Sequence, residues 1–146
     1  MKENTSIFEL RMVKIYETKM VRITEPEDIV EVFEDVFFMS ELAEEMMIMA
    51  CLNTKNEVVG LFKVSQGSLN ASIAHPREIF KRAVLANANS IILGHNHPSG
   101  DVTLSDEDIN VTERVIKAGE ILGIKLLDHV VMAGGDFISM GVEGII

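Results

Sequence analysis

Apolar and polar residues alternate along the first part of the chain, in residues 7–23 (IFELRMVKIYETKMVRI). Alternation of this kind is typical of a strand with one buried face, so we predict one long strand or a hairpin here. The spacing then becomes helical after Pro26, which with its acidic neighbours favours a first helical turn. We predict a helix that runs to about residue 38 and a connection over 39–42. The residues expected on its buried face are Ile29, Val32, Phe33, Val36 and Phe37.

Two apolar runs predict a pair of strands in the middle of the chain. The first run, residues 46–52, follows the two glutamates Glu44 and Glu45. Turn-forming residues at 53–56 separate it from a second run at 57–65. We therefore predict a buried strand that begins at the acids, a returning strand, and a polar loop over residues 67–72.

The next stretch predicts a helix and then a short strand. The helix begins at His75-Pro76-Arg77-Glu78 and ends near residues 87–89. The strand is the apolar run from Ser90 to Gly94, which leads directly into His95. The residues expected on the buried face of the helix are Ile79, Phe80, Ala83 and Val84.

A third helix and a hairpin complete the predicted fold. The helix begins at Ser105 and is stopped by Gly123. Residues 124–132 and 137–140 predict the two strands of the hairpin. The order β, α, β-β, α, β, α, β-β predicts a mixed β-sheet flanked by helices, of the α/β (α+β) class. The apolar residues of the third helix are Ile109, Val115, Ile116, Ile121 and Leu122.

Composition limits the classes of protein to consider. A chain of 146 residues is expected to form one domain, residues 1–146. Its formal net charge of −10 argues against broad binding to nucleic acid, which needs clustered basic residues. The single cysteine, Cys51, cannot form an intramolecular disulfide. With no apolar leader and no run near the roughly 20 residues of a membrane helix, we expect a cytoplasmic protein that meets no membrane.

The candidate chemistry centres on two histidines and an aspartate. His95 and His97 are two positions apart in an extended segment, so their rings point to the same side. Asp108 falls in the first turn of the next helix, near enough to add a carboxylate oxygen. Two imidazoles and one carboxylate with an open fourth position are typical of a catalytic zinc, which activates water and polarises a carbonyl. We therefore predict a Zn²⁺ site with His95, His97 and Asp108 as ligands.

Two features of this prediction have alternatives. Ser105 and Asp108 also have the spacing of a helix capping box, and a carboxylate that reaches back to the cap is less free to bind metal. A catalytic zinc needs a general base, for which sequence position favours Glu45 with Glu44 as the rival. Both could instead be solvated acids before a strand. The adjacent Asp128 and His129 could support the site or the fold, and we favour a structural role.

The spacing of these residues resembles a known signature. His95-x-His97, Ser105 and Asp108, with an upstream glutamate, resemble the JAMM motif of the JAB/MPN metalloprotease fold, which is cytidine-deaminase-like. The run His-Asn-His-Pro-Ser-Gly-Asp at 95–101 is similar to the bacterial RadC branch, as are Pro76-Arg77-Glu78 and Leu127-Asp128-His129. The resemblance covers roughly residues 45–141, the expected JAMM core, and leaves residues 1–40 as an N-terminal strand and helix.

The resemblance implies a role for each site residue. His95, His97 and Asp108 would be zinc ligands, Glu45 the general base and Ser105 a hydrogen-bond partner of the oxyanion. In the RadC branch a glutamate precedes a strand ending in Leu-Asp-x-Lys-Asn. Here Glu45 precedes the strand that ends in Leu52-Asn53-Thr54-Lys55-Asn56, which favours it over Glu44.

The sequence departs from the family pattern in ways that bear on function. Residues 1–40 do not resemble the helix-hairpin-helix region that RadC proteins usually carry, so a DNA-repair role gains no support. The insertions that hold ubiquitin in related isopeptidases also have no room here. We predict a zinc-dependent hydrolase of peptide or isopeptide bonds with a peptide or protein substrate. The alternatives are a protein acting on or near nucleic acid and a noncatalytic MPN interaction module. The alternating N-terminal segment could pair with a second copy in a homo-oligomer.

Overall fold

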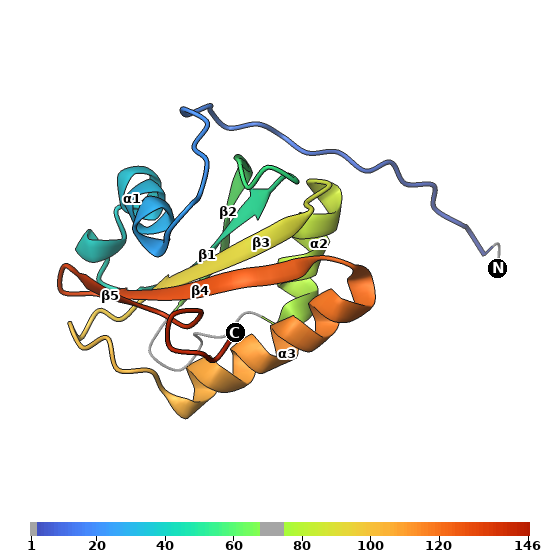
Figure 1. Cartoon of the computed structure of the whole chain (residues 1–146). Helices are drawn as coiled ribbons and strands as arrows, with labels where there is room; N and C mark the ends of the chain where they lie inside the picture. The colour runs from blue at the N-terminus through green and yellow to red at the C-terminus, as the bar shows by residue number, and fades with distance from the viewer. Residues whose placement is uncertain (1–2, 68–74) are drawn as a thin grey trace.

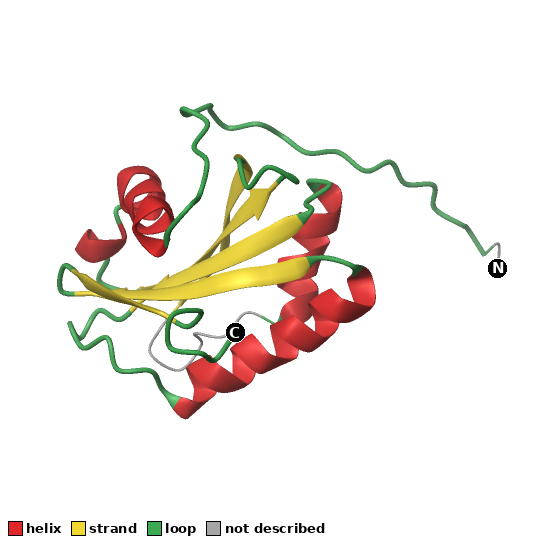
Figure 2. Cartoon of the chain, viewed as in Figure 1, coloured by secondary structure: helices red, strands yellow, loops and turns green. Residues whose placement is uncertain are grey.

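A five-stranded mixed sheet forms the centre of the protein (Figures 1 and 2). The computed structural model describes residues 3–67 and 75–146. Within them, no helix combines the length and the apolar character needed to cross a membrane. The elements in chain order are α1 (Pro26–Phe37), the short 3-10 helix η1 (Met39–Glu41), β1 (Glu45–Leu52), β2 (Val58–Gly67), α2 (Pro76–Leu85), β3 (Ser90–Asn96), α3 (Asp106–Leu122), β4 (Lys125–Ala133) and β5 (Asp136–Ser139).

The strand order β2-β1-β3-β4-β5 places β3 in the middle of the sheet. β1 runs antiparallel to both β2 and β3, and β4 runs antiparallel to β5. β3 and β4 are parallel, with α3 as the connection between them. Figure 1 shows α1 on one face of this sheet and α2 and α3 on the other. The predicted α/β class, a mixed sheet flanked by helices, is confirmed.

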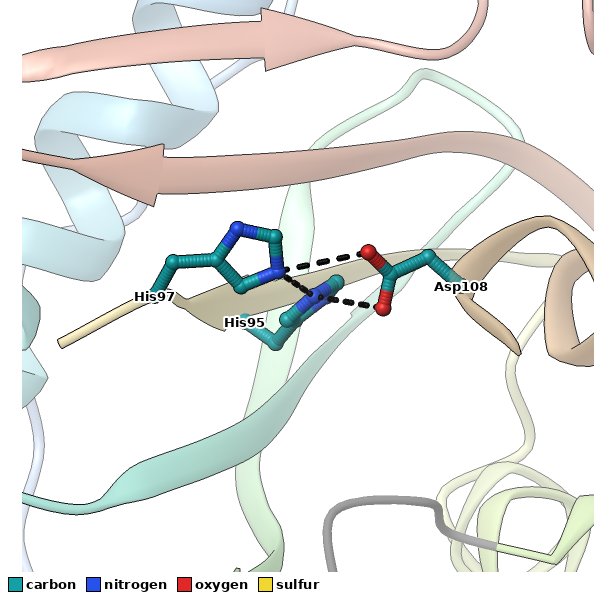
Figure 3. A group of neighbouring side chains, drawn as sticks. All are labelled: His95, His97 and Asp108. Carbon is teal, nitrogen blue, oxygen red and sulfur yellow. Dashed lines mark hydrogen bonds and ion pairs between the residues drawn. The ribbon is translucent and has the colours of Figure 1, made fainter. Parts of the chain in front are cut away.

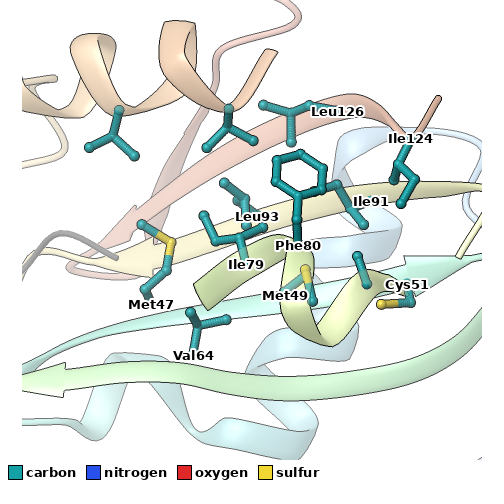
Figure 4. Packing of buried hydrophobic residues seen from close by; sticks show 13 residues of the cluster. Met47, Met49, Cys51, Val64, Ile79, Phe80, Ile91, Leu93, Ile124 and Leu126 are labelled. Carbon is teal, nitrogen blue, oxygen red and sulfur yellow. The ribbon is translucent and has the colours of Figure 1, made fainter. Parts of the chain in front are cut away.

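The two faces of the sheet bury two separate apolar clusters. β1 illustrates the division, since Met47, Met49 and Cys51 face α2 and α3, whereas Met46 and Ile48 face α1. Figure 4 shows the packing of the first cluster. Because successive side chains of a strand point to opposite faces, a strand covered on both faces reads as a continuous apolar run. This explains why both β1 and β3 were predictable as strands without any alternation.

Gly94 allows α1 to lie close against β3, directly before the histidines. A Cβ atom at this position would lie 2.6 Å from the ring of Phe33, which is fully buried. A non-bonded carbon contact is comfortable only at about 3.5 Å or more. The glycine therefore sets the distance between α1 and the central strand.

The strand predicted for residues 7–23 is wrong. Residues 3–20 are extended and exposed, with Ile7 at 98% and Ile15 at 90% of full exposure, and Figure 1 shows this segment leading away from the sheet. The chain first meets the sheet at the start of the edge strand β2, where the carbonyl of Val21 accepts from the N–H of Val58 and Arg22 pairs antiparallel with Glu57. Alternation specifies the two faces of a strand, but it does not supply the neighbouring backbone that a strand requires.

The predicted buried face of α3 is also partly wrong. Ile121 is 86% exposed and Leu122 is half exposed. The inner face of α3 instead includes Thr112 and Gly119, which an apolar pattern does not mark. At the end of the helix, a Cβ on Gly119 would lie 2.2 Å from the carbonyl oxygen of Ile124, so only glycine allows this approach. The buried residues of α3 are Val111, Thr112, Val115 and Gly119.

The remaining boundaries differ by a few residues from the prediction. β3 continues through Asn96, two residues beyond the predicted end, so that His95 lies within the strand. β2 reaches Gly67, where the predicted loop 67–72 begins, and the rest of that loop lies outside the described residues. The helix from residue 76 ends at Leu85.

Candidate metal centre

The central strand β3 brings two histidines to one face of the sheet. His95 is the penultimate residue of β3, and His97 follows the strand directly. The backbone N–H of His97 donates to the carbonyl of Met132 at 2.8 Å, so the chain remains extended one residue past the strand. As the i, i+2 spacing predicts, the rings lie on the same side, and their Nε2 atoms are 3.0 Å apart.

The first turn of α3 brings the carboxylate of Asp108 to the same point. Its Oδ1 lies 3.1 Å from His95 Nε2, and its Oδ2 lies 3.3 Å from His97 Nε2. Figure 3 shows the three side chains converging from β3 and α3. Gly100, with φ of 87°, occupies the turn that reverses the chain after His97.

The three side chains fit a divalent metal ion in both chemistry and spacing. One ligand atom from each, two imidazole nitrogens and one carboxylate oxygen, lies within 4.8 Å of the others. A tetrahedral ion with bonds of about 2.0–2.1 Å holds its ligand atoms roughly 3.3–3.4 Å apart. The 3.0 Å between the two Nε2 atoms and the 3.1 Å from His95 Nε2 to Asp108 Oδ1 are close to that spacing. The predicted grouping of His95, His97 and Asp108 can therefore hold a metal ion.

The charges of the cluster favour a cation. Burial raises the pKa of Asp108, but hydrogen bonds with His95 and His97 lower it more, so its pKa lies well below the usual range. The hydrogen bond with Asp108 raises the pKa of His97 against the opposing effect of burial. An ionised carboxylate thus faces two ring nitrogens in a site that is largely shielded from water.

Asp108 also completes the cap of its own helix. The backbone N–H of Ser105 donates to Oδ2 of Asp108 at 2.8 Å, and the N–H of Asp108 donates to the hydroxyl oxygen of Ser105 at 3.0 Å. Capping and metal binding were predicted to compete for this carboxylate. The structure shows that they are compatible, because Oδ1 faces His95 and takes no part in the cap.

Glu45 lies on the same face of the sheet as the histidines. It is the first residue of β1, two positions before Met47, which pairs with His95. Strand alternation therefore places Glu45 on the face of the histidines, whereas Glu44 lies in the bend before the strand. Glu45 lines a cleft of about 310 Å³ together with His97, Ser105 and Asp108. This placement agrees with the preference for Glu45 over Glu44.

Asn96 fixes the start of β1 beside the site, a role that the sequence did not reveal. Its side-chain oxygen accepts from the backbone N–H of Met46 at 2.7 Å, and its amide donates to the carbonyl of Glu44 at 3.0 Å. The two backbone groups flank Glu45. Asn96 alternates with the two histidines and so points to the α1 face, and the spacing His-Asn-His alone gives no signal for this contact.

A second layer of contacts surrounds the histidines. Nδ1 of His97 donates to the carbonyl of Asp101 at 2.8 Å. Nδ1 of His95 lies 2.8 Å from Nε2 of His129, whose own Nδ1 lies 2.7 Å from the hydroxyl of Thr112. His129 is fully buried, and burial lowers its pKa well below the ordinary value. The favoured structural role for His129 is thus incomplete, because its ring contacts a predicted ligand directly.

Asp128, in contrast, supports the fold. Its carboxylate accepts from the hydroxyl of Ser139 at 2.6 Å and from the backbone N–H of Gly141 at 2.9 Å. These bonds hold the turn that follows β5. The structural role predicted for Asp128 agrees with these contacts.

Comparisons with known proteins identify the family to which this fold and site belong. Residues 23–145 match the family described as the RadC-like JAB domain. The chain therefore belongs to the RadC family. It is 48% identical over 126 residues to a UPF0758 protein of Clostridium beijerinckii, 86% of this chain and 54% of that one. It is 51% identical over 131 residues to a UPF0758 protein of Shouchella clausii, 88% of this chain and 56% of that one. The chain spans about half the length of these relatives.

Proposed function

We propose that this domain is a zinc-dependent hydrolase of amide bonds in a peptide or isopeptide. The observation that carries the proposal is the cleft in which Glu45 and Ser105 lie beside His97 and Asp108, next to the ligand cluster. Two imidazoles and one carboxylate are a ligand set that zinc favours in catalytic sites, with a position left for water or substrate. Family membership supports the same chemistry.

Each residue of the cleft has a role in this proposal. His95, His97 and Asp108 hold the zinc, which when bound lowers the pKa of water and polarises the substrate carbonyl. Glu45 accepts a proton from the attacking water while the oxygen of that water bonds to the carbonyl carbon. Glu45 then gives this proton to the amide nitrogen as the carbon–nitrogen bond breaks, so that an acid and an amine leave.

Ser105 supplies a hydrogen bond to the oxyanion. Its hydroxyl oxygen accepts from the backbone N–H of Asp108, which leaves its own proton to donate. Ser105 lines the cleft, so this proton can reach a bound substrate. A donor already oriented by a helix cap stabilises developing charge with little reorganisation.

The test measures metal and activity in the same set of variants. Purified protein loaded with zinc is expected to hold about one ion per chain, and the His95→Ala/His97→Ala variant to hold none. A peptide library then reports hydrolysis. Glu45→Gln is expected to keep zinc and lose hydrolysis, with Glu44→Gln as the matched control that keeps both.

Three results would contradict the proposal. Zinc absent from wild type after loading would remove the metal site. Equal activity of Glu45→Gln and wild type would remove Glu45 as the base. Hydrolysis that survives in the His95→Ala/His97→Ala variant would assign the activity to something other than this cleft.

A further inference from the structure

A chain of buried hydrogen bonds leads from the ring of His95 back to the backbone of Asp108. His95 contacts His129, and His129 contacts Thr112, as described above. The hydroxyl of Thr112 donates to the carbonyl oxygen of Asp108 at 2.8 Å. Both His129 and Thr112 are completely buried, so each polar atom of these two side chains needs a hydrogen-bond partner within the protein.

The contacts of Thr112 determine where its proton goes. The hydroxyl has one proton and lies near two groups that can only accept, the carbonyl of Asp108 and the sulfur of Met140 at 3.1 Å. With the proton directed to these acceptors, the hydroxyl oxygen is left to accept from His129. The proton of the neutral His129 ring is thereby placed on Nδ1.

The position of the proton on His129 determines that on His95. With its proton on Nδ1, His129 presents an unprotonated Nε2, which accepts from Nδ1–H of His95 at 2.8 Å. A neutral His95 ring then has its lone pair on Nε2, the atom that faces His97 and Asp108. Nδ1 of His97 is likewise protonated, because the backbone carbonyl of Asp101 can only accept a hydrogen bond from it.

We propose that His129 and Thr112 are positioning residues that fix the tautomer and orientation of His95 for metal binding. This inference rests on the proposed metal site. It adds His129, for which the sequence favoured a structural role, and Thr112, which no sequence pattern marked. Metal-binding histidines generally donate their second N–H to a partner that raises the affinity of the site. Here that partner is the imidazole of His129. The series of hydrogen bonds ends at the backbone carbonyl of Asp108, so it connects a proposed ligand on β3 with one on α3.

The variants are chosen to separate the hydroxyl of Thr112 from its bulk. Thr112→Val removes the hydroxyl with little change in shape, whereas Thr112→Ser keeps it. Val115→Ala is the matched control, because Val115 is fully buried on the same helix and has no polar contact with the site. His129→Leu removes both ring nitrogens at once, and its folding is checked by circular dichroism.

Two measurements test the proposal. Competition with a chromophoric chelator gives zinc affinity, which we expect to fall about 10-fold or more in Thr112→Val and His129→Leu. Thr112→Ser and Val115→Ala should keep the wild-type affinity. In the metal-free protein, ¹⁵N NMR of the imidazoles should show protons on Nδ1 of both His95 and His129, and Thr112→Val should alter this pattern.

The outcomes distinguish this proposal from the metal site itself. An unprotonated Nδ1 of His95 in the metal-free wild type would overturn the proposal. Equal losses of affinity in Thr112→Val and Val115→Ala would also overturn it, because a general loss of packing would then explain both. A wild type that binds no zinc would overturn the proposed function, and the NMR tautomers would still decide the state of His95.

Discussion

Ser105 and Asp108 exchange two hydrogen bonds across the first turn of α3, and the same carboxylate faces both histidines. The cap therefore orients the candidate ligand. A carboxylate held by a backbone N–H has fewer rotamers to lose when a metal binds, and the acidic first turn agrees with the helix dipole. The stability of the helix and the geometry of the site depend on one pair of residues.

Two substitutions at Ser105 separate its structural role from its chemical role. Ser105→Ala should lower the free energy of unfolding by about 1 kcal/mol, and Ser105→Gly by only a few tenths, because glycine is tolerated at the N-cap. Urea denaturation measures both. Each variant lacks the hydroxyl, so hydrolysis should fall equally in the two. Activity that follows stability would instead mean that Ser105 only caps the helix.

Gly94→Ala tests the close packing of α1 on β3. The added Cβ would lie 2.6 Å from the Phe33 ring, so we expect a loss of about 1–3 kcal/mol in the free energy of unfolding. Adding Phe33→Leu should recover part of that loss, because the two positions are in contact and their effects do not add. Strict additivity of the two single variants in urea denaturation would contradict this account of Gly94.

The thiol of Cys51 should be inert in the folded protein. Burial raises its pKa to about 12, so below that pH the native thiol remains protonated. A coloured disulfide reagent at pH 8 should therefore react slowly with native protein and rapidly in concentrated urea. Because thiolate forms only as pH rises through the folded pKa, the native rate should not follow the pH profile of a free cysteine. Rapid labelling without denaturant would refute the burial of Cys51.

Deletion of the exposed N-terminal segment should leave the domain stable. Residues 3–19 are exposed, so removing residues 1–19 should change the free energy of unfolding by no more than about 0.5 kcal/mol. Removing residues 1–24 is the comparison, because Val21 bonds to Val58 at the start of β2, Ile23 bonds to Asn56 just before it, and both pack on the α1 cluster. A large loss from the shorter deletion would mean that the segment pairs with the sheet, or with a second copy, in solution.

The sequence predicted most accurately those elements whose residue pattern is compatible with only one structure. β1 and β3 are buried on both faces, so each is a continuous apolar run, and the i, i+2 histidines share a face in any extended chain. The grouping with Asp108 followed from helix position and was strengthened by resemblance to a known motif.

The sequence did not reveal the contacts of His129 and Asn96, because these depend on the register between strands that are distant in sequence. The parallel pairing of β3 with β4 sets Leu93 opposite His129 and so brings His129 to His95. The antiparallel pairing of β1 with β3 brings Asn96 to Met46. No local pattern determines these registers. The strand prediction for residues 7–23 was wrong for the same reason, because alternation does not specify which strand the segment pairs with.

The candidate metal ligands lie on elements that the fold holds to different degrees. His95 belongs to the central strand, paired on both sides, whereas Asp108 lies at a helix end joined to it by an exposed loop. Local unfolding in native proteins begins at such ends and reaches central strands last. If the cluster binds an ion, we expect its lifetime to depend on fraying of the first turn of α3, which amide exchange at residues 106–109 should report.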